Sequence, residues 1–254
     1  MSSTPPTKPP FGADLPPWPE IDFSAFGPVE SKPLHRMQKL VASFMARNWV
    51  MIPHVTHHDE ADVSALDATR KRLSAELGVK LTPLAFLVKA AVATLERHPI
   101  FNASLDGTGA NLVFKKYFNI GIAVDTPNGL LVPVIHNADK KSLAEIATEI
   151  TEVSELARTK GVPMARMSGG CFTISSLGSI GGTAFTPIIN APEVAIMGIS
   201  KSYEKPVKVD GQLAWRIMLP LSLSYDHRVI NGAAAARFCV DFGKALTELA
   251  GGSA

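Results

Sequence analysis

The chain has 254 residues, of which 46% are apolar and 19% carry a charge, and its formal net charge is +2. This balance is typical of a globular protein with a substantial core, and it gives no bulk electrostatic reason to expect nucleic acid or a membrane as a partner. The sequence has no apolar run long enough to span a bilayer, and its polar, proline-rich N-terminus is unlike a secretory signal.

The composition changes along the chain and suggests three parts. Residues 1–30 are rich in proline, which fixes φ and removes backbone donors, so we expect a flexible but extended linker or tail. No similar break follows before residue 250, and residues 31–250 are predicted to form one domain. Residues 251–254 form a small polar tail. The two cysteines, Cys171 and Cys239, lie in apolar surroundings and are expected to be buried free thiols.

Apolar spacing and capping residues predict helices and one strand in the first part of the domain. The predicted elements are a helix at 32–48 with Ser31 as its N-cap and Pro33 in its first turn, a strand at 52–58, a helix at 62–77 capped by Asp62 and stopped by Gly78, and a helix at 82–98 with Pro83 at its first position.

Shorter elements follow, and strands dominate. We expect two or three strands within 101–124, a hairpin turn at 126–129 between strands 120–124 and 130–135, a helix at 142–160, strands at 171–174, 194–200, 206–209 and 213–225, and a helix at 233–249. Strands and helices mix without strict alternation, so the predicted class is α+β with a mixed sheet rather than a doubly wound sheet.

The most informative segment connects the last predicted strand to the last helix, and it reads Tyr225-Asp226-His227-Arg228-Val229-Ile230-Asn231-Gly232. A histidine on a short connection between two rigid elements can act as a base with a fixed orientation. The alternative interpretation is a solvated loop histidine with no chemical role.

Four segments together carry a resemblance to a known family. The pattern His227-x-x-x-Asn231-Gly232 resembles the His-x-x-x-Asp-Gly motif of the 2-oxoacid dehydrogenase acyltransferases and of the chloramphenicol acetyltransferases that share their fold. Residues 47–62, 119–135 and 172–200 resemble further segments of the acyltransferase catalytic domain, and the last is similar to the acetyl-transferring branch. The resemblance spans residues 31–248. It implies a chloramphenicol acetyltransferase-like mixed sheet flanked by helices and assembled as a homotrimer.

The resemblance also implies a reaction and its groups. Imidazole, with a pKa of about 6.5, can take a proton from a thiol of pKa about 8.5 and return it to a leaving thiolate. By resemblance, His227 is the general base, and Ser175 of a neighbouring subunit donates a hydrogen bond to the tetrahedral oxyanion. The alternative interpretation of Ser175 is a strand-end serine that bonds to its own backbone.

The implied activity is acetyl transfer between dihydrolipoamide and coenzyme A in a pyruvate dehydrogenase-type complex. Coenzyme A is a substrate, the lipoyl group comes from a domain absent from this chain, and the other complex subunits are partners. The implied coenzyme A contacts are Ser176, Gly182, Thr183, Phe185 and Pro187. The expected location is the bacterial cytoplasm, or the mitochondrial matrix in a eukaryote. Alternatives are another coenzyme A-dependent acyl- or O-acetyltransferase, a non-catalytic structural core, and an acetoin-type complex.

Two details depart from a simple match. Asn231 stands where the family motif most often has Asp, so it keeps the hydrogen-bonding groups but loses the charge. We expect it to organise the loop, and Arg36, Arg47 and Arg70 are candidates for a partner. The small polar tail offers little apolar area, so assembly of trimers into larger particles is predicted to be weak or absent.

A metal site is not expected. His54, His57 and His58 are close in sequence, but no cysteine or carboxylate cluster completes a ligand set.

Overall fold

A seven-stranded mixed sheet forms the centre of the computed structural model, which describes residues 19–127 and 129–251. The strand order is β1-β11-β9-β8-β4-β7, and β10 pairs with the outer part of β11. The helices are α1 (Arg36–Met51), α2 (Leu66–Leu77), α3 (Pro83–Arg97), α4 (Leu143–Thr159) and α5 (Gly232–Ala250). The strands are β1 (His54–Asp62), β2 (Ala103–Leu105), β3 (Leu112–Phe114), β4 (Ile120–Ile122), β5 (Val124–Thr126), β6 (Gly129–Leu131), β7 (Val134–Ile135), β8 (Phe172–Ser176), β9 (Ala195–Ile199), β10 (Tyr203–Val209) and β11 (Gln212–Asp226).

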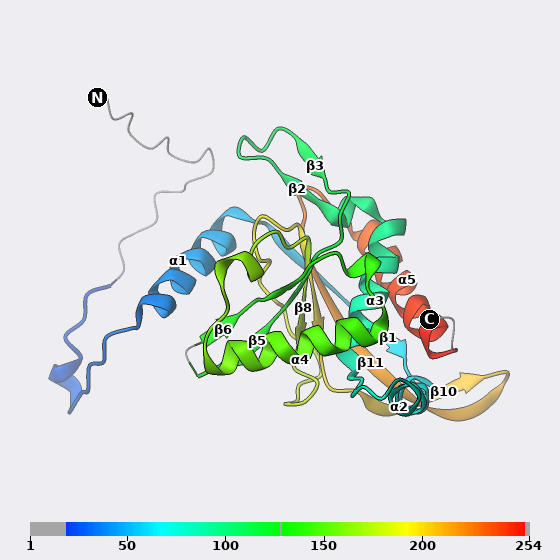
Figure 1. Ribbon diagram of the computed structural model, residues 1–254. Coiled ribbons are helices and arrows are strands. Elements are labelled where there is room, and N and C mark those ends of the chain that lie inside the picture. The colour runs from blue at the N-terminus through cyan, green and yellow to red at the C-terminus, as the bar shows by residue number, and fades with distance from the viewer. Residues whose placement is uncertain (1–18, 128, 252–254) are drawn as a thin grey trace.

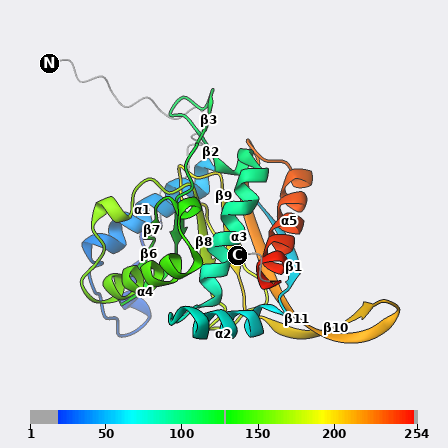
Figure 2. The same ribbon diagram turned by 45° about the vertical axis from the view of Figure 1, so that its right-hand side comes forward.

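The sheet contains both pairing directions. Strand β8 runs parallel to β4 and β9, whereas β11 runs antiparallel to β1, β9 and β10. Helices α3, α4 and α5 pack on one face of the sheet (Figures 1 and 2). The predicted α+β class with a mixed sheet is therefore confirmed.

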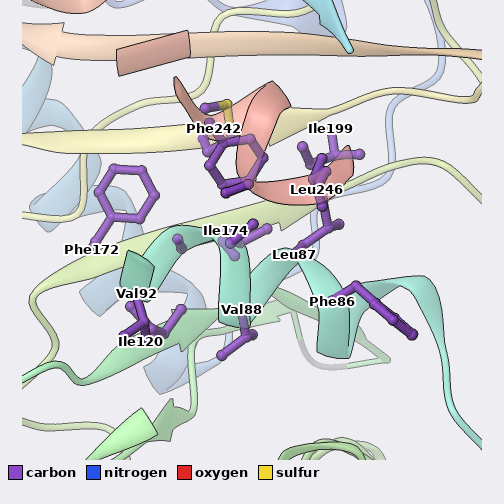
Figure 3. Packing of buried hydrophobic residues seen from close by; sticks show 14 of the residues in the cluster. Phe86, Leu87, Val88, Val92, Ile120, Phe172, Ile174, Ile199, Phe242 and Leu246 are labelled. Atoms are coloured by element: carbon purple, nitrogen blue, oxygen red, sulfur yellow. The ribbon is translucent and has the colours of Figure 1, made fainter. Parts of the chain in front are cut away.

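The main core lies between this sheet face and helices α3 and α5 (Figure 3). Helix α3 supplies Phe86, Val88 and Val92, and α5 supplies Phe242 and Leu246. Burial of each such side chain stabilises the fold by roughly 1.5–3 kcal/mol. This core fixes the position of β11 and α5, and therefore of the connection that carries His227. The thiols of Cys171 and Cys239 are free and buried, as the sequence predicts.

Two predicted helix starts are wrong. Helix α1 begins at Arg36, where the backbone N–H of His35 donates to the side chain of Gln38 at 2.9 Å, so Ser31 and Pro33 precede the helix. Asp62 is the last residue of β1 and not a helix cap, because its backbone is extended opposite Met218 of β11. Its carboxylate instead accepts hydrogen bonds from Ser64, and α2 begins at Leu66.

The predicted hairpin at 120–135 is split between two sheets. Strand β5 pairs with β6 around the predicted turn, whereas β4 pairs with β7 as part of the main sheet. Asn128 of that turn lies outside the described residues, as do residues 1–18 of the predicted linker and residues 252–254 of the predicted tail. The prediction of weak assembly beyond a trimer therefore stays a prediction.

Helix α1 projects from the body of the protein (Figure 1). It exposes Met37, Leu40 and Phe44, and the segment before it exposes Phe23 and Phe26. Met37, Leu40 and Phe44 recur at helical spacing along one face of α1, and an exposed apolar face is typical of a surface that binds another protein chain. Within residues 19–127 and 129–251, no helix combines the length and apolar character needed to cross a membrane.

Candidate active site

His227 is the first residue after β11, at the start of the connection to α5. Its backbone N–H donates to the carbonyl of Pro53 at 3.1 Å, which ties the connection to the start of β1. Its side chain is exposed, and the imidazole lies 5.8 Å from the ring of buried Tyr225. The backbone of His227 is therefore fixed while its ring remains accessible to a substrate.

The two sequence neighbours of His227, Asp226 and Arg228, form an ion pair with each other. Arg228 donates from Nη2 to Asp226 Oδ2 at 2.6 Å and from Nε to Asp226 Oδ1 at 2.9 Å. These hydrogen bonds raise the pKa of the Arg228 guanidinium, and Asp226 is buried. The carbonyl of Asp226 also accepts from the N–H groups of Val229 and Ile230. A two-point ion pair around a tight turn restricts the backbone on which His227 stands.

Asn231 is the N-cap of α5. Its Oδ1 accepts from the backbone N–H of Ala234 at 2.9 Å. The arginine partners considered from the sequence are not supported. Arg47 bonds to its neighbour Asn48, and Arg70 bonds to Asp67 and to the carbonyl of Leu81.

Arg36, the third candidate partner, is the first residue of α1, at the end of that helix farther from the sheet (Figure 1). The ionic contact of the connection is instead made by Arg228 with Asp226.

Replacing Asn231 with alanine is expected to lower the free energy of unfolding by about 1 kcal/mol, because α5 loses its capping acceptor. Asn231→Asp keeps the acceptor and places a negative charge at a helix N-terminus, so it is expected to cost nothing or to stabilise slightly. Urea denaturation of both variants measures the difference. An Asp variant less stable than the Ala variant would contradict the capping role.

Ser175 lies near the other end of the sheet from His227. It is opposite Gly198 of β9, which in turn is opposite Ser222 of β11. Since His227 follows Ser222 by five residues, the two predicted catalytic residues are separated by about 16 Å along the strand direction at ~3.3 Å per residue. The fold of one copy therefore holds them apart.

The sheet face that carries Ser175 is polar and lies opposite to the helices. Opposed residues of neighbouring strands point to the same face, so the side chains of Thr56, His58, Ser222 and Ser224 share it. Thr56 bonds to Ser224 at 2.8 Å, and Nδ1 of His58 bonds to Ser222 at 2.9 Å. The alternation in β11 indicates these serines, but nothing in the local sequence identifies Thr56 and His58 as their partners.

Phe185 covers this face beside Ser175. A Cβ atom added to Gly198 would lie only 2.7 Å from Cζ of the Phe185 ring, so the ring occupies the space that a side chain there would need. Because neighbouring strands are about 4.8 Å apart, the ring lies next to the position of Ser175. Gly198 was not identified from the sequence, since its role depends on a contact with a distant loop.

The predicted coenzyme A residues belong to the end of β8 and to the loop that follows it. Ser176 is exposed at the strand end, and Gly182 has a φ of +86°, which glycine adopts without strain. Thr183 lines a cavity of about 330 Å³ with His58, Asp59, Glu60, Ala184, Pro220 and Leu221. Pro187 is buried. The loop therefore brings Thr183 and Phe185 to the face of the sheet that holds Ser175.

Glu193 is a buried acid that sequence reasoning missed. Burial raises its pKa to about 7, although Lys115 and Asn190 favour its charged form. Gly170 leaves room for it, because a Cβ there would lie 2.8 Å from Glu193 Oε1. The next residue, Val194, accepts the backbone N–H of Asp226 at 2.9 Å. Glu193 is thus the sequence neighbour of the residue that holds the end of β11, directly before His227.

The three histidines of β1 do not gather around a metal position. Both ring nitrogens of His54 bond to backbone groups, and His58 bonds to Ser222. Across the described part of the chain, no three His, Cys, Asp or Glu side chains are grouped as metal ligands.

Comparison with known proteins extends these observations. The sequence model of the family "2-oxoacid dehydrogenases acyltransferase (catalytic domain)" matches residues 26–251. A relative from Cupriavidus necator, named dihydrolipoyllysine-residue acetyltransferase component of pyruvate dehydrogenase complex, is 60% identical over 91% of this chain and 42% of its own length. A relative of the same name from Haemophilus influenzae is 51% identical over 94% of this chain and 43% of its own. The chain thus spans about two fifths of these relatives.

Solved structures agree with the sequence matches. The dihydrolipoamide acetyltransferase of Azotobacter vinelandii is 52% identical, with a TM-score of 0.89 over 92% of this chain and 98% of that one. That structure was determined to investigate a serine, a histidine and an asparagine in its catalytic mechanism. The histidine there follows the serine by 52 positions and precedes the asparagine by 4, the same spacings as Ser175, His227 and Asn231.

A second structure with the same identity and TM-score is the cubic core of a pyruvate dehydrogenase multienzyme complex. A chloramphenicol acetyltransferase is 14% identical with a TM-score of 0.55, which shows a shared fold alone. The family match over residues 26–251, together with these structures, confirms the resemblance predicted from the sequence. The chain belongs to the 2-oxoacid dehydrogenase acyltransferases, as their catalytic domain.

Proposed function

We propose that this chain transfers an acetyl group between dihydrolipoamide and coenzyme A, as the catalytic domain of the acyltransferase component of a pyruvate dehydrogenase complex. One observation carries the proposal above the others. Ser175, His227 and Asn231 repeat the residue types and spacings of the serine, histidine and asparagine studied in the catalytic mechanism of a 52% identical dihydrolipoamide acetyltransferase. The same match accounts for an asparagine at position 231 in place of the more common aspartate.

In the proposed reaction, the imidazole of His227 takes the proton of the coenzyme A thiol. The resulting thiolate attacks the carbonyl carbon of acetyl-dihydrolipoamide, and the carbonyl oxygen becomes an oxyanion. The hydroxyl of Ser175 donates a hydrogen bond to that oxyanion. When the tetrahedral intermediate collapses, the bond to the dihydrolipoamide sulfur breaks. The leaving thiolate takes the proton back from His227, so acetyl-CoA and dihydrolipoamide are released.

We further propose that each active site lies between two copies of the chain in a homotrimer. The separation of about 16 Å between Ser175 and His227 within a copy supports this arrangement, because one oxyanion and one thiol must reach both groups. The exposed apolar side chains of α1 and of the segment before it provide a surface for the neighbouring copy.

The substrates are proposed to meet at the polar sheet face. Coenzyme A would lie along Ser176, Gly182, Thr183, Phe185 and Pro187, and the lipoyl group would come from a domain outside this chain. Asn231 and the pair of Asp226 and Arg228 would organise the connection that holds His227. A chain that acts together with the other subunits of the complex would be located in the bacterial cytoplasm or, in a eukaryote, in the mitochondrial matrix. We also propose that residues 1–30 act as a linker.

An acceptor comparison tests the function. The purified chain is incubated with acetyl-CoA and either free dihydrolipoamide or chloramphenicol, and the release of coenzyme A is followed. We expect saturable transfer to dihydrolipoamide and none to the hydroxyl acceptor. Transfer to chloramphenicol without transfer to the dithiol would contradict the proposal and favour an O-acetyltransferase.

A further inference from the structure

His54 uses both of its ring nitrogens in contacts with the backbone. Its Nε2 lies 3.0 Å from the backbone N–H of Ile189, so this nitrogen must accept the hydrogen bond. Its Nδ1 lies 2.8 Å from the carbonyl of Ile52 and must donate. Only the neutral imidazole with its proton on Nδ1 satisfies both contacts. The ring also stacks on Trp49, with centroids 5.6 Å apart.

These contacts join two segments that bind the backbone of Asp226 and His227. The residue before His54, Pro53, accepts the backbone N–H of His227, and His54 itself is opposite Asp226 in the sheet. On the other side, the turn that begins at Ile189 leads to Val194, whose carbonyl accepts the N–H of Asp226. His54 therefore links the two backbone segments that hold Asp226 and His227.

We propose that His54 is a positioning residue, which keeps the backbone of His227 in its reactive place by holding the turn at Ile189 against the start of β1. This inference rests on the proposed acetyl transfer with His227 as its base. His54 touches no reacting atom, so it acts only through these segments. Displacement of a catalytic group by about 1 Å can lower the rate by about 100-fold.

The charged groups near His54 are bonded to other partners, so none of them takes over its contacts with Ile52 and Ile189. Across the sheet, the carboxylate of Asp226 is bonded to Arg228. On α1, Arg47 bonds to Asn48, whose side chain donates to the carbonyl of Ile189 at 2.9 Å. Glu193 lies farther along the turn and is buried.

Two substitutions separate the two ring contacts. In His54→Gln, the side-chain oxygen can reach the position of Nε2 and still accept from Ile189. In His54→Asn, the shorter amide reaches only the position of Nδ1, so it can donate to Ile52 but leaves the N–H of Ile189 unpaired. His57→Gln is the matched control, since His57 is in the same strand but is opposite Leu223 and faces the other side of the sheet.

The measurements are kcat and KM for both substrates, on intact assemblies of each variant. We expect kcat of His54→Asn to fall by about 10- to 100-fold with little change in KM, and His54→Gln to recover most of it. His57→Gln should match the wild type in both.

The inference is overturned if kcat of His54→Asn equals that of the wild type, or if His54→Gln loses as much kcat as His54→Asn. If His54→Asn does not assemble, His54→Gln alone decides, because a fall of its kcat by about 10-fold or more in an intact assembly, despite the retained acceptor for Ile189, would overturn the inference. A wild-type chain without acetyl transfer would instead refute the proposed function, so the two failures are distinguishable.

Discussion

Replacing His227 with alanine is expected to lower kcat for acetyl transfer by about 1000-fold in either direction, because the attacking thiol then has no positioned base. The side chain is exposed, and its backbone contact to Pro53 does not depend on the ring. The variant should therefore keep the assembly and the free energy of unfolding of the wild type. Steady-state rates with acetyl-CoA and dihydrolipoamide, together with urea denaturation, measure both quantities.

A chemical control sharpens this test. Since the imidazole of His227 is accessible, added free imidazole should recover part of the activity of His227→Ala at neutral pH. A loss smaller than 10-fold would show that the reaction does not use this residue as its base.

The second large effect is expected from Ser175→Ala, which should lower kcat by about 100- to 1000-fold. The hydroxyl is proposed to bind the oxyanion, which exists only after the thiolate attacks, so KM for coenzyme A should change little. The structure offers a matched control in Ser224→Ala, on the same sheet face. That variant loses the hydrogen bond to Thr56 and should lose stability while keeping most of its kcat.

Equal kcat values for Ser175→Ala and the wild type would support the alternative interpretation of Ser175 as a strand-end serine. A rise in KM without a fall in kcat would assign Ser175 to substrate binding alone.

Much of the fold could be predicted because local signals agreed with the tertiary structure. The alternation before His227 and the apolar spacing after it placed β11 and α5 to within a residue or two. The predicted start of α2 is wrong because the local signal and the tertiary structure disagree there. Asp62 has the chemistry of an N-cap, but pairing with Met218 keeps its backbone extended, and sheet pairing is not visible in a local window.

The site was only partly predictable on the same grounds. A motif can name Ser175 and His227, but the sheet register decides that they stand at opposite ends of a polar face. The contact of Phe185 with Gly198, and the two backbone contacts of His54, join segments far apart in the sequence. From the sequence, His54 suggests only a metal ligand, because nothing local shows that both of its ring nitrogens are already hydrogen-bonded.

Each active site is proposed to take His227 from one copy of the chain and Ser175 from another. Inactive His227→Ala and Ser175→Ala chains can be co-expressed, with different affinity tags so that mixed assemblies are isolated, and assayed for acetyl transfer. If sites form between copies of a cyclic trimer, each isolated mixed trimer has one site with both residues intact, so about a third of its sites should be active. Mixed assemblies as inactive as either parent would contradict the shared site and return both residues to a single copy.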